Sequence, residues 1–168
     1  MPTESFFNET RIVVGLGTGC LPEGTYQPIL LSGYIGIDLK KHFPKLARLS
    51  GTLSFILEPQ IRTILEPESA VECGLGIGLH YRYPIRDSLS FYLMGSIGPH
   101  YLAIETSEQA RGFLFTDSLE AGLYYHLTKD SAITLGYRFN HLSNAHLKLP
   151  NNGIDSHFAI LGYSVFFN

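Results

Sequence analysis

The chain has 168 residues, enough for one domain or one small closed barrel and hardly enough for two domains. Charged residues make up 16% of it, against roughly 25% in ordinary soluble proteins, while glycine and aromatic residues are abundant. The net charge of -3, without a Lys/Arg cluster among the aromatic residues, excludes a nucleic-acid-binding surface. No apolar run approaches the ~18 residues that a transmembrane helix needs. We therefore expect residues 1–168 to form a single domain, and membrane insertion would have to use strands.

The N-terminus and the two cysteines carry little functional signal. Residues 1–5 lack the basic head and apolar core of a secretion signal. For an exported protein this predicts a mature form with an added methionine; a natural cytoplasmic start is the alternative. Cys20 and Cys73 fit no metal spacing and fall on strands that are not predicted to be neighbours, so we expect two free thiols.

Apolar residues alternate with polar or glycine residues in eight segments, which predicts eight β-strands. The alternation is clearest in residues 71–83, where one face is apolar and the other carries glycine and charge. In chain order, the predicted strands are residues 11–19, 29–39, 51–58, 71–83, 89–101, 113–125, 133–143 and 154–167. Pro59 is expected to close the third strand.

The connections between these strands predict which end of each strand faces which compartment. With both termini on the periplasmic side, four longer connections face outward, at residues 20–28, 59–70, 105–112 and 144–153. Two of the three inner connections are short turns, at residues 84–87 and 128–131. The third, residues 40–50, contains Lys40, Lys41, Lys45 and Arg48; we expect a solvated connection, with an anion site as the alternative. This asymmetry is typical of bacterial outer-membrane barrels.

The pattern predicts an all-β fold, an eight-stranded antiparallel transmembrane β-barrel of the bacterial outer membrane. Its polar face, with Glu72, Arg82 and Glu120 among glycines, would fill a narrow interior with ion pairs, so we do not expect a transport pore. The alternative is a soluble barrel of the lipocalin kind, but charges that should coat its exterior are scarce. Aromatic residues also gather near one rim, as a membrane girdle would: Tyr81, Tyr83, Phe91, Tyr125 and Phe167.

The seventh predicted strand carries the strongest functional signal. Its apolar face, which includes Tyr137 and Phe139, continues directly into His141 and Ser143. In a soluble core these two polar side chains would need buried partners. If the face contacts lipid instead, they lie where hydrocarbon meets headgroups. That position predicts a lipid-cleaving site.

These residues favour nucleophilic catalysis. Ser143 is two positions from His141 on the same face, so the imidazole can remove its hydroxyl proton. Asp155 begins the next antiparallel strand with the same outward parity and can orient the imidazole. Each residue alone is more often an ordinary strand-end side chain, but together they predict a Ser-His-Asp triad. Asn144, Asn151 and the Gly153 backbone are candidates to support the oxyanion.

No metal or other cofactor is expected. The three histidines on the polar face, His80, His100 and His126, do not have the spacing of metal ligands. His146, Lys148 and His157 lie close to the predicted triad in sequence, and we expect them to face headgroups rather than to catalyse.

The segment from His141 to Asp155 resembles PagL, the outer-membrane lipid A 3-O-deacylase family, whose final strands carry the pattern H-x-S-N … P-N-x-G-[IV]-[ED]. The matching residues are His141, Ser143, Asn144, Pro150, Asn151, Gly153 and Asp155. Leu57-Glu58-Pro59 and the ending from Gly162 to Phe167 are also similar. Characterised members of the family carry Glu where this chain has Asp155, whose side chain is shorter by one methylene.

The resemblance implies a serine esterase that hydrolyses the 3-position acyl chain of lipid A, or lipopolysaccharide, in the outer leaflet. It implies contact with outer-membrane lipids and leaves a homodimer open as the assembly state. The alternative is a non-catalytic outer-membrane barrel with a structural or adhesive role.

Overall fold

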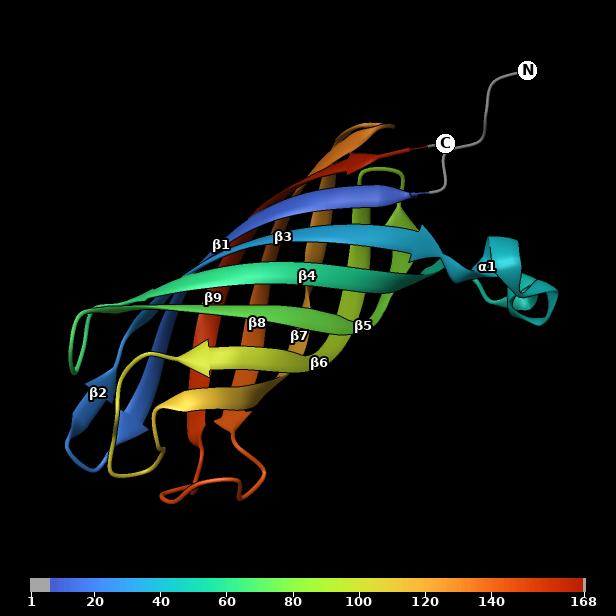
Figure 1. Ribbon diagram of the computed structural model, residues 1–168. Helices are drawn as coiled ribbons and strands as arrows, with labels where there is room; N and C mark the ends of the chain where they lie inside the picture. The colour runs from blue at the N-terminus through green and yellow to red at the C-terminus, as the bar shows by residue number, and fades with distance from the viewer. Residues whose placement is uncertain (1–6, 168) are drawn as a thin grey trace.

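The computed structural model describes residues 7–167, so the N-terminal residues discussed above lie outside the described part. It is a closed antiparallel barrel of eight long strands in which β1 pairs with β9 (Figure 1), and this confirms the predicted fold class. A short additional strand, β2, pairs with the end of β1. The strands are β1 (Glu9–Leu21), β2 (Gly24–Tyr26), β3 (Pro28–Asp38), β4 (Thr52–Ile64), β5 (Ala70–Arg86), β6 (Leu89–Leu102), β7 (Gly112–Thr128), β8 (Ser131–Ser143) and β9 (Ile154–Phe166).

Side chains alternate between the two faces of the barrel wall. Apolar side chains such as Ile12, Ile97 and Leu135 point outward and are exposed, whereas Arg11, Glu58 and Arg138 are buried in the interior. This is the reverse of the soluble alternative and is typical of a barrel with lipid around it. Helices of residues 7–167 are all too short or too polar to span a bilayer.

A buried ion network crosses the middle of the barrel. Arg138 on β8 contacts Glu58 on β4 at 2.5 Å and Glu120 on β7 at 2.6 Å. Glu120 also contacts Arg11 on β1 at 3.0 Å, and Tyr92 donates a hydrogen bond to it at 2.7 Å. The charges alternate in sign and bond to one another, so each of these buried charges lies beside an opposite one.

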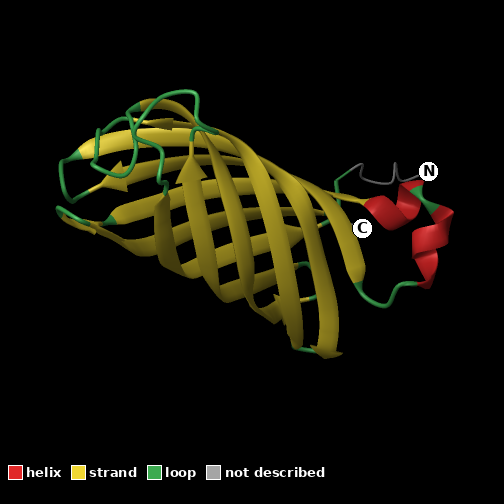
Figure 2. Cartoon of the chain, turned by 90° about the horizontal axis from the view of Figure 1, so that it is seen from below, coloured by secondary structure: helices red, strands yellow, loops and turns green. Residues whose placement is uncertain are grey.

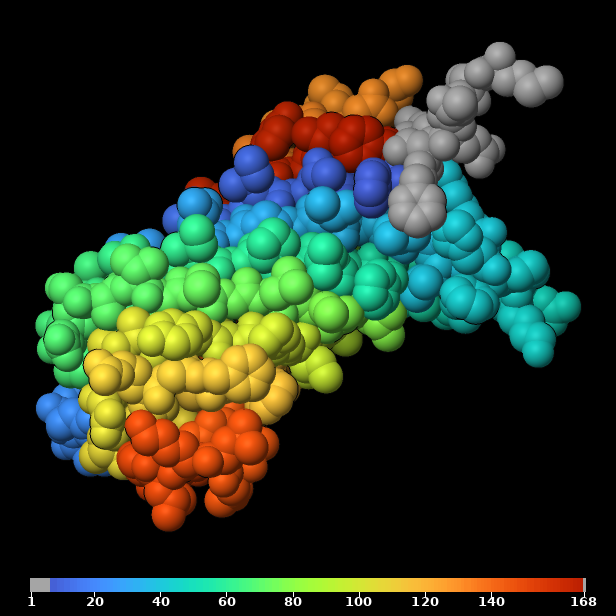
Figure 3. All heavy atoms as spheres, viewed as in Figure 1, coloured from blue at the N-terminus to red at the C-terminus, as the bar shows by residue number. Residues whose placement is uncertain are grey.

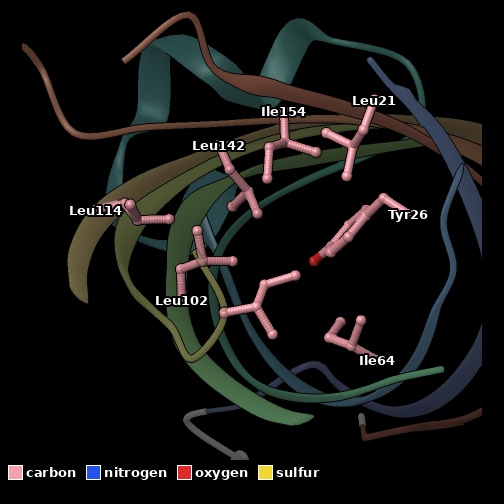
Figure 4. Close-up of a cluster of buried hydrophobic side chains, with 8 residues drawn as sticks. Leu21, Tyr26, Ile64, Leu102, Leu114, Leu142 and Ile154 are labelled. Carbon is pink, nitrogen blue, oxygen red and sulfur yellow. The ribbon is translucent and has the colours of Figure 1, made fainter. Parts of the chain in front are cut away.

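Apolar layers close the barrel on both sides of this network. Towards the end that carries the 144–153 connection, eight side chains converge on the axis (Figure 4): Leu21, Tyr26, Ile64, Leu102, Ile104, Leu114, Leu142 and Ile154. Towards the other end an aromatic-rich cluster contains Tyr34, Tyr92, Tyr124 and Phe166. The interior is therefore packed with side chains, as the sequence predicts.

Two predicted loops are wrong. Residues 20–28 are not a free loop, because β1 continues to Leu21 and β2 folds back onto it. Pro59 does not close a strand: β4 runs through it to Ile64, so only residues 65–69 connect β4 to β5. The ladder between β3 and β4 is interrupted beside Pro59, between the Ser32–Gln60 and Ile35–Leu57 pairs. A proline lacks the N–H group that this ladder needs, yet its other side still pairs with β5.

The connection between β3 and β4 contains two short helices, α1 (Leu39–His42) and η1 (Pro44–Arg48). The Asp38 carboxylate caps α1 by accepting a hydrogen bond from the Lys40 backbone N–H at 2.8 Å. This connection lies at the same end of the barrel as the start of β1 and the end of β9 (Figures 1 and 2). The opposite end carries the connections at residues 65–69, 103–111 and 144–153.

The ion network makes a prediction about stability. Glu120→Gln leaves Arg11 and Arg138 buried with less compensating charge, so we expect the free energy of unfolding to fall by about 3–5 kcal/mol. Urea unfolding of the barrel refolded in phospholipid vesicles measures this. The matched control is Glu105→Gln on an exposed connection, with an expected change within about 0.5 kcal/mol. Equal unfolding midpoints for the two variants would contradict the structural importance of the network.

Candidate active site

Three polar side chains form one row on the outer surface, near the rim that the apolar cluster of Figure 4 closes. The strand register aligns Asp117 on β7, His141 on β8 and Asp155 on β9. His141 Nδ1 lies 2.6 Å from Asp155 Oδ1, and about one third of the histidine side chain is exposed. The inward-facing neighbours Asn140 and Leu142 are buried, which fixes the outward direction of His141.

Ser143 occupies the next row towards the rim, beside Phe115. It shares the outward face of β8 with His141 and is half-buried. In residues 7–167, neither its hydroxyl nor the Nε2 atom of His141 has a protein hydrogen-bond partner. The structure therefore brings together the three residues of the predicted triad on one face, with the Nε2 side of the imidazole still available.

Gly153 packs against the imidazole. Its φ is +88°, and a Cβ atom there would lie 2.4 Å from His141 Cε1 and 3.0 Å from Nε2. Both the backbone conformation and the space therefore require glycine. The sequence predicted Gly153 only as a backbone donor. The structure shows that Gly153 also leaves room for the His141 ring, because glycine has no Cβ atom.

A tight turn follows Ser143. The Leu147 N–H donates to the Asn144 carbonyl at 3.0 Å, and the two central residues, Ala145 and His146, have φ values of 52° and 63°. Two consecutive non-glycine residues in the left-handed region are uncommon, and such strain concentrates at functional sites. In the described part of the chain, their N–H groups donate to no protein acceptor. Sequence reasoning missed these two donors, because only the fold reveals the turn.

Asn144 and Asn151 organise the connection between β8 and β9. Asn151 Oδ1 accepts a hydrogen bond from the Asn144 N–H at 2.6 Å, and Asn144 Nδ2 donates to the Lys148 carbonyl at 2.7 Å. Asn144 is buried, whereas Leu147 and Leu149 are highly exposed on the same connection. The two asparagines therefore hold the loop, and its apolar tips face outward.

Neighbouring loops brace this connection. Ala110 donates from its backbone to the Pro150 carbonyl at 2.9 Å, and Asn152 donates to the Glu108 carbonyl at 2.7 Å. The Ser107 backbone N–H donates to Glu23 at 2.8 Å, and the Ser107 hydroxyl bonds the same carboxylate. These two bonds hold the pKa of Glu23 below its ordinary value. The β1–β2 hairpin, residues 103–111 and residues 144–153 thus form one layer over the apolar cluster.

An apolar groove of about 680 Å³ starts at Ser143 and crosses the outer face of β7, β6 and β5. Its lining residues are Ile77, Ile97, Gly98, Pro99, Phe115, Asp117, Ser143 and Ala145. Asp117 is the one charged side chain among them. The sequence already pointed to Asp117, because this residue interrupts the apolar face of its strand. An acidic side chain on a lipid-facing surface has an unfavourable solvation free energy, so its presence there indicates a functional role.

The other polar residues near the triad have structural contacts. His157, predicted to face headgroups, is exposed on the outer wall, and its Nδ1 lies 2.5 Å from the Tyr137 hydroxyl. Histidines 80 and 100 are buried in the interior, as expected. Among residues 7–167, no group of three or more His, Cys, Asp or Glu side chains is arranged to hold a metal ion.

The fold and the site define a membrane β-barrel whose polar, hydrolase-like residues lie on its apolar outer surface. The model of the family described as lipid A 3-O-deacylase (PagL) matches residues 36–164, and the chain belongs to this family. It is therefore a hydrolase of the lipid A deacylase family, with lipid A as its class of substrate, and is located in the bacterial outer membrane. No curated protein sequence matches the chain.

Solved structures share the fold. Neisserial surface protein A superposes with a TM-score of 0.69 at 15% identity, covering 97% of this chain and 98% of that one. The outer-membrane enzyme PagL gives a TM-score of 0.64 at 21% identity, covering 91% and 98%. The N-terminal barrel of Pseudomonas aeruginosa OprF gives 0.56 at 15% identity, covering 95% and 98%. At these identities the likeness concerns the fold.

The contact between Gly153 and His141 is testable. Gly153→Ala places a methyl group against the imidazole, so we expect deacylation to fall about 100-fold while the barrel still folds. Release of fatty acid from purified lipid A in mixed micelles measures this. Gly112→Ala is the matched control, because Gly112 also has a positive φ but nothing lies within 4 Å of its added Cβ. Equal losses in both variants would show that backbone strain, rather than displacement of the imidazole, causes the effect.

Proposed function

We propose that this protein is a serine esterase that hydrolyses the ester-linked acyl chain at the 3-position of lipid A, with Ser143 as nucleophile, His141 as general base and Asp155 as orienter. The observation that carries the proposal is the 2.6 Å bond between His141 Nδ1 and Asp155 on the lipid-facing wall, with Ser143 on the same face. A histidine and a carboxylate bonded there do not serve the packing of the barrel.

The proposed reaction follows from the atoms available. Bonding of Nδ1–H to Asp155 leaves Nε2 as the basic nitrogen. As Ser143 Oγ attacks the ester carbonyl, its proton passes to Nε2 and a tetrahedral oxyanion forms. Collapse of this intermediate breaks the bond between the carbonyl carbon and the 3-oxygen of the sugar, and that oxygen takes the proton from Nε2. Water, activated by the same nitrogen, then hydrolyses the acyl-enzyme to a free 3-hydroxy fatty acid and restores Ser143.

The oxyanion needs donors close to Ser143. The unengaged N–H groups of Ala145 and His146 are the best candidates, since the strained turn presents them directly after the nucleophile. Asn144, Asn151 and Gly153 support this arrangement by holding the turn and making room for the imidazole. The sequence suggested these three residues as the donors, but the Asn144 N–H and Nδ2 groups already donate within the loop. We therefore assign the donor role to the turn backbone and a supporting role to Asn144, Asn151 and Gly153.

The groove beside Ser143 suits the acyl chain. It is lined mainly by apolar side chains and lies on the outer wall, so a lipid in the bilayer can enter it laterally and need not enter the barrel. Leu147 and Leu149 on the adjoining connection face the same surroundings. The substrate is therefore presented with its chain along the wall and its ester at the rim.

The alternative function, a structural or adhesive barrel, is less well supported. The surface proteins among the structural relatives have only 12–15% identity to this chain, and their likeness concerns the barrel alone. Lipid A mass spectra from cells that express the wild-type chain separate the two hypotheses. Loss of one hydroxyacyl chain is expected for the esterase, and an unchanged lipid A for the structural role.

The nucleophile assignment predicts that Ser143→Ala lowers deacylation at least about 1,000-fold while leaving the fold intact. Mass spectrometry of lipid A after incubation with the purified variant measures the loss. Ser131→Ala, at the opposite end of the same strand, is the matched control and should keep wild-type activity. If Ser143→Ala retained activity, Ser143 would not be the nucleophile.

Substitutions of Asp155 test its role. Asp155→Asn should lower kcat by about 100- to 1,000-fold, less than for a fully buried triad acid, because much of this side chain is exposed. Asp155→Glu, which introduces the residue that characterised members of the resembled family carry, should stay within about tenfold of wild type. Heat-modifiable mobility on gels verifies folding in both. If both variants are as active as wild type, the triad reduces to a Ser-His pair.

Asp117 provides a second carboxylate beside His141. Its charge would stabilise the imidazolium that forms in the transition state, so Asp117→Asn should lower kcat by about tenfold with KM nearly unchanged. Asp87→Asn, in the turn at the other end of the barrel, is the control. A rise in KM with unchanged kcat would instead assign Asp117 to substrate binding.

A further inference from the structure

The connection between β3 and β4 is built unlike the other two connections at its end of the barrel. Residues 87–88 and 129–130 are two-residue turns, whereas residues 39–51 form α1 and η1. Neither helix contains a buried residue, so this segment contributes nothing to a core. In the space-filling view it projects beyond the barrel wall (Figure 3). Packing against the barrel therefore does not account for the side chains found in this segment.

The charge of this segment is of one sign. Lys40, Lys41, Lys45 and Arg48 lie within nine residues, and no Asp or Glu occurs between Asp38 and Glu58. Lys40 is engaged internally, because its Nζ donates to the Gly51 carbonyl at 2.7 Å and also to the Leu49 carbonyl. Within residues 7–167, Lys41, Lys45 and Arg48 form no salt bridge. Lys45 and Arg48 line a shallow recess of about 360 Å³ with Pro44.

Two large apolar side chains accompany these cations. Phe43 and Leu49 are 55% and 43% exposed, although nothing in the barrel requires them at the surface. Phe55 and Leu57 continue the apolar surface along β4 on the outer wall. The combination of exposed aromatic and aliphatic residues with free cations is that of segments that lie in a membrane interface.

A hydrogen bond sets the depth at which the segment leaves the wall. The Tyr81 hydroxyl donates to the Ser50 carbonyl at 2.8 Å, and the ring centroids of Tyr81 and Tyr83 are 6.5 Å apart. Outward tyrosines at a barrel rim lie at headgroup level. The base of the segment is therefore level with the headgroups, and its cations are within reach of them.

We propose that residues 39–50 form a docking surface for anionic phospholipid headgroups in the leaflet at the end of the barrel opposite to the triad. Phe43 and Leu49 enter the interface, while Lys41, Lys45 and Arg48 bind phosphate and so enrich anionic lipid beside β4. The interaction anchors this end of the barrel and fixes its depth and tilt in the bilayer. It is independent of the proposed triad.

The absence of tryptophan from the chain allows a direct test. Phe43→Trp introduces a single fluorophore into the segment of the full chain, reconstituted in phosphatidylcholine vesicles. Its quenching by brominated phosphatidylglycerol is compared with quenching by brominated phosphatidylcholine at equal mole fraction. We expect at least about fivefold selectivity for phosphatidylglycerol, which corresponds to the attraction of about one cation to an anionic surface. This selectivity should be lost in 0.5 M NaCl, where the Debye length is about 4 Å.

The matched variant combines Phe43→Trp with Lys41→Gln, Lys45→Gln and Arg48→Gln, and its selectivity should approach one. Phe91→Trp on the outer wall of β6 reports a second position near the same rim, and the triple glutamine change should leave its quenching unaltered. Selectivity that survives both the glutamine changes and high salt would overturn the proposal. So would Phe43→Trp fluorescence that neither brominated lipid quenches, which would place the segment in water. The salt titration of the single variant decides the matter even if the multiple variant fails to fold.

Discussion

The bonding of Arg138 to Glu58 and Glu120 is the constraint on which the rest of this structure depends. A strand shifted by one residue would bring Arg138 into hydrocarbon and His141 into the lumen, because side-chain direction alternates. The buried ion pairs make that shift costly, since each charge would lose its partner and its surroundings. The same network that fills the interior therefore places the catalytic candidates on the outside of the same strand.

The end of the barrel that carries the 144–153 connection serves as a rigid base for the candidate site. The apolar cluster that includes Leu142 and Ile154 closes the lumen directly behind the row of His141 and Asp155. Above it, three connections bond to one another through their backbones and through Glu23. Catalytic groups need to be held closely in position, and here residues on two strand ends are braced by packing from inside and by loops from above. On the proposed assignment, a lipid would reach the site from the bilayer along the groove on the outer wall, without any opening of the barrel.

The two ends of the barrel differ in chemistry. At the end that carries the candidate site, Asp117 and Asp155 flank His141 and an apolar groove begins at Ser143. At the other end, the helical connection carries Lys41, Lys45 and Arg48 together with the exposed Phe43. A lipid-cleaving barrel has to hold a fixed depth so that its site stays level with the ester that it cleaves. The proposed docking surface at residues 39–50 would supply that constraint from the leaflet at the opposite end of the barrel. The two proposed surfaces would then act together to set the position of the protein in its membrane.

The sequence by itself determined the barrel, its strand number and the outward direction of His141, Ser143 and Asp155, because a period of two assigns every side chain to a face. It also indicated the family, through a motif of closely spaced residues. Only the tertiary structure revealed that β4 passes through Pro59, that Asp117 lies beside His141, and that Gly153 leaves room for the imidazole. These facts depend on register between strands and on contacts between residues far apart in the chain. Local alternation carries no information about either, since pairing is decided when the barrel closes.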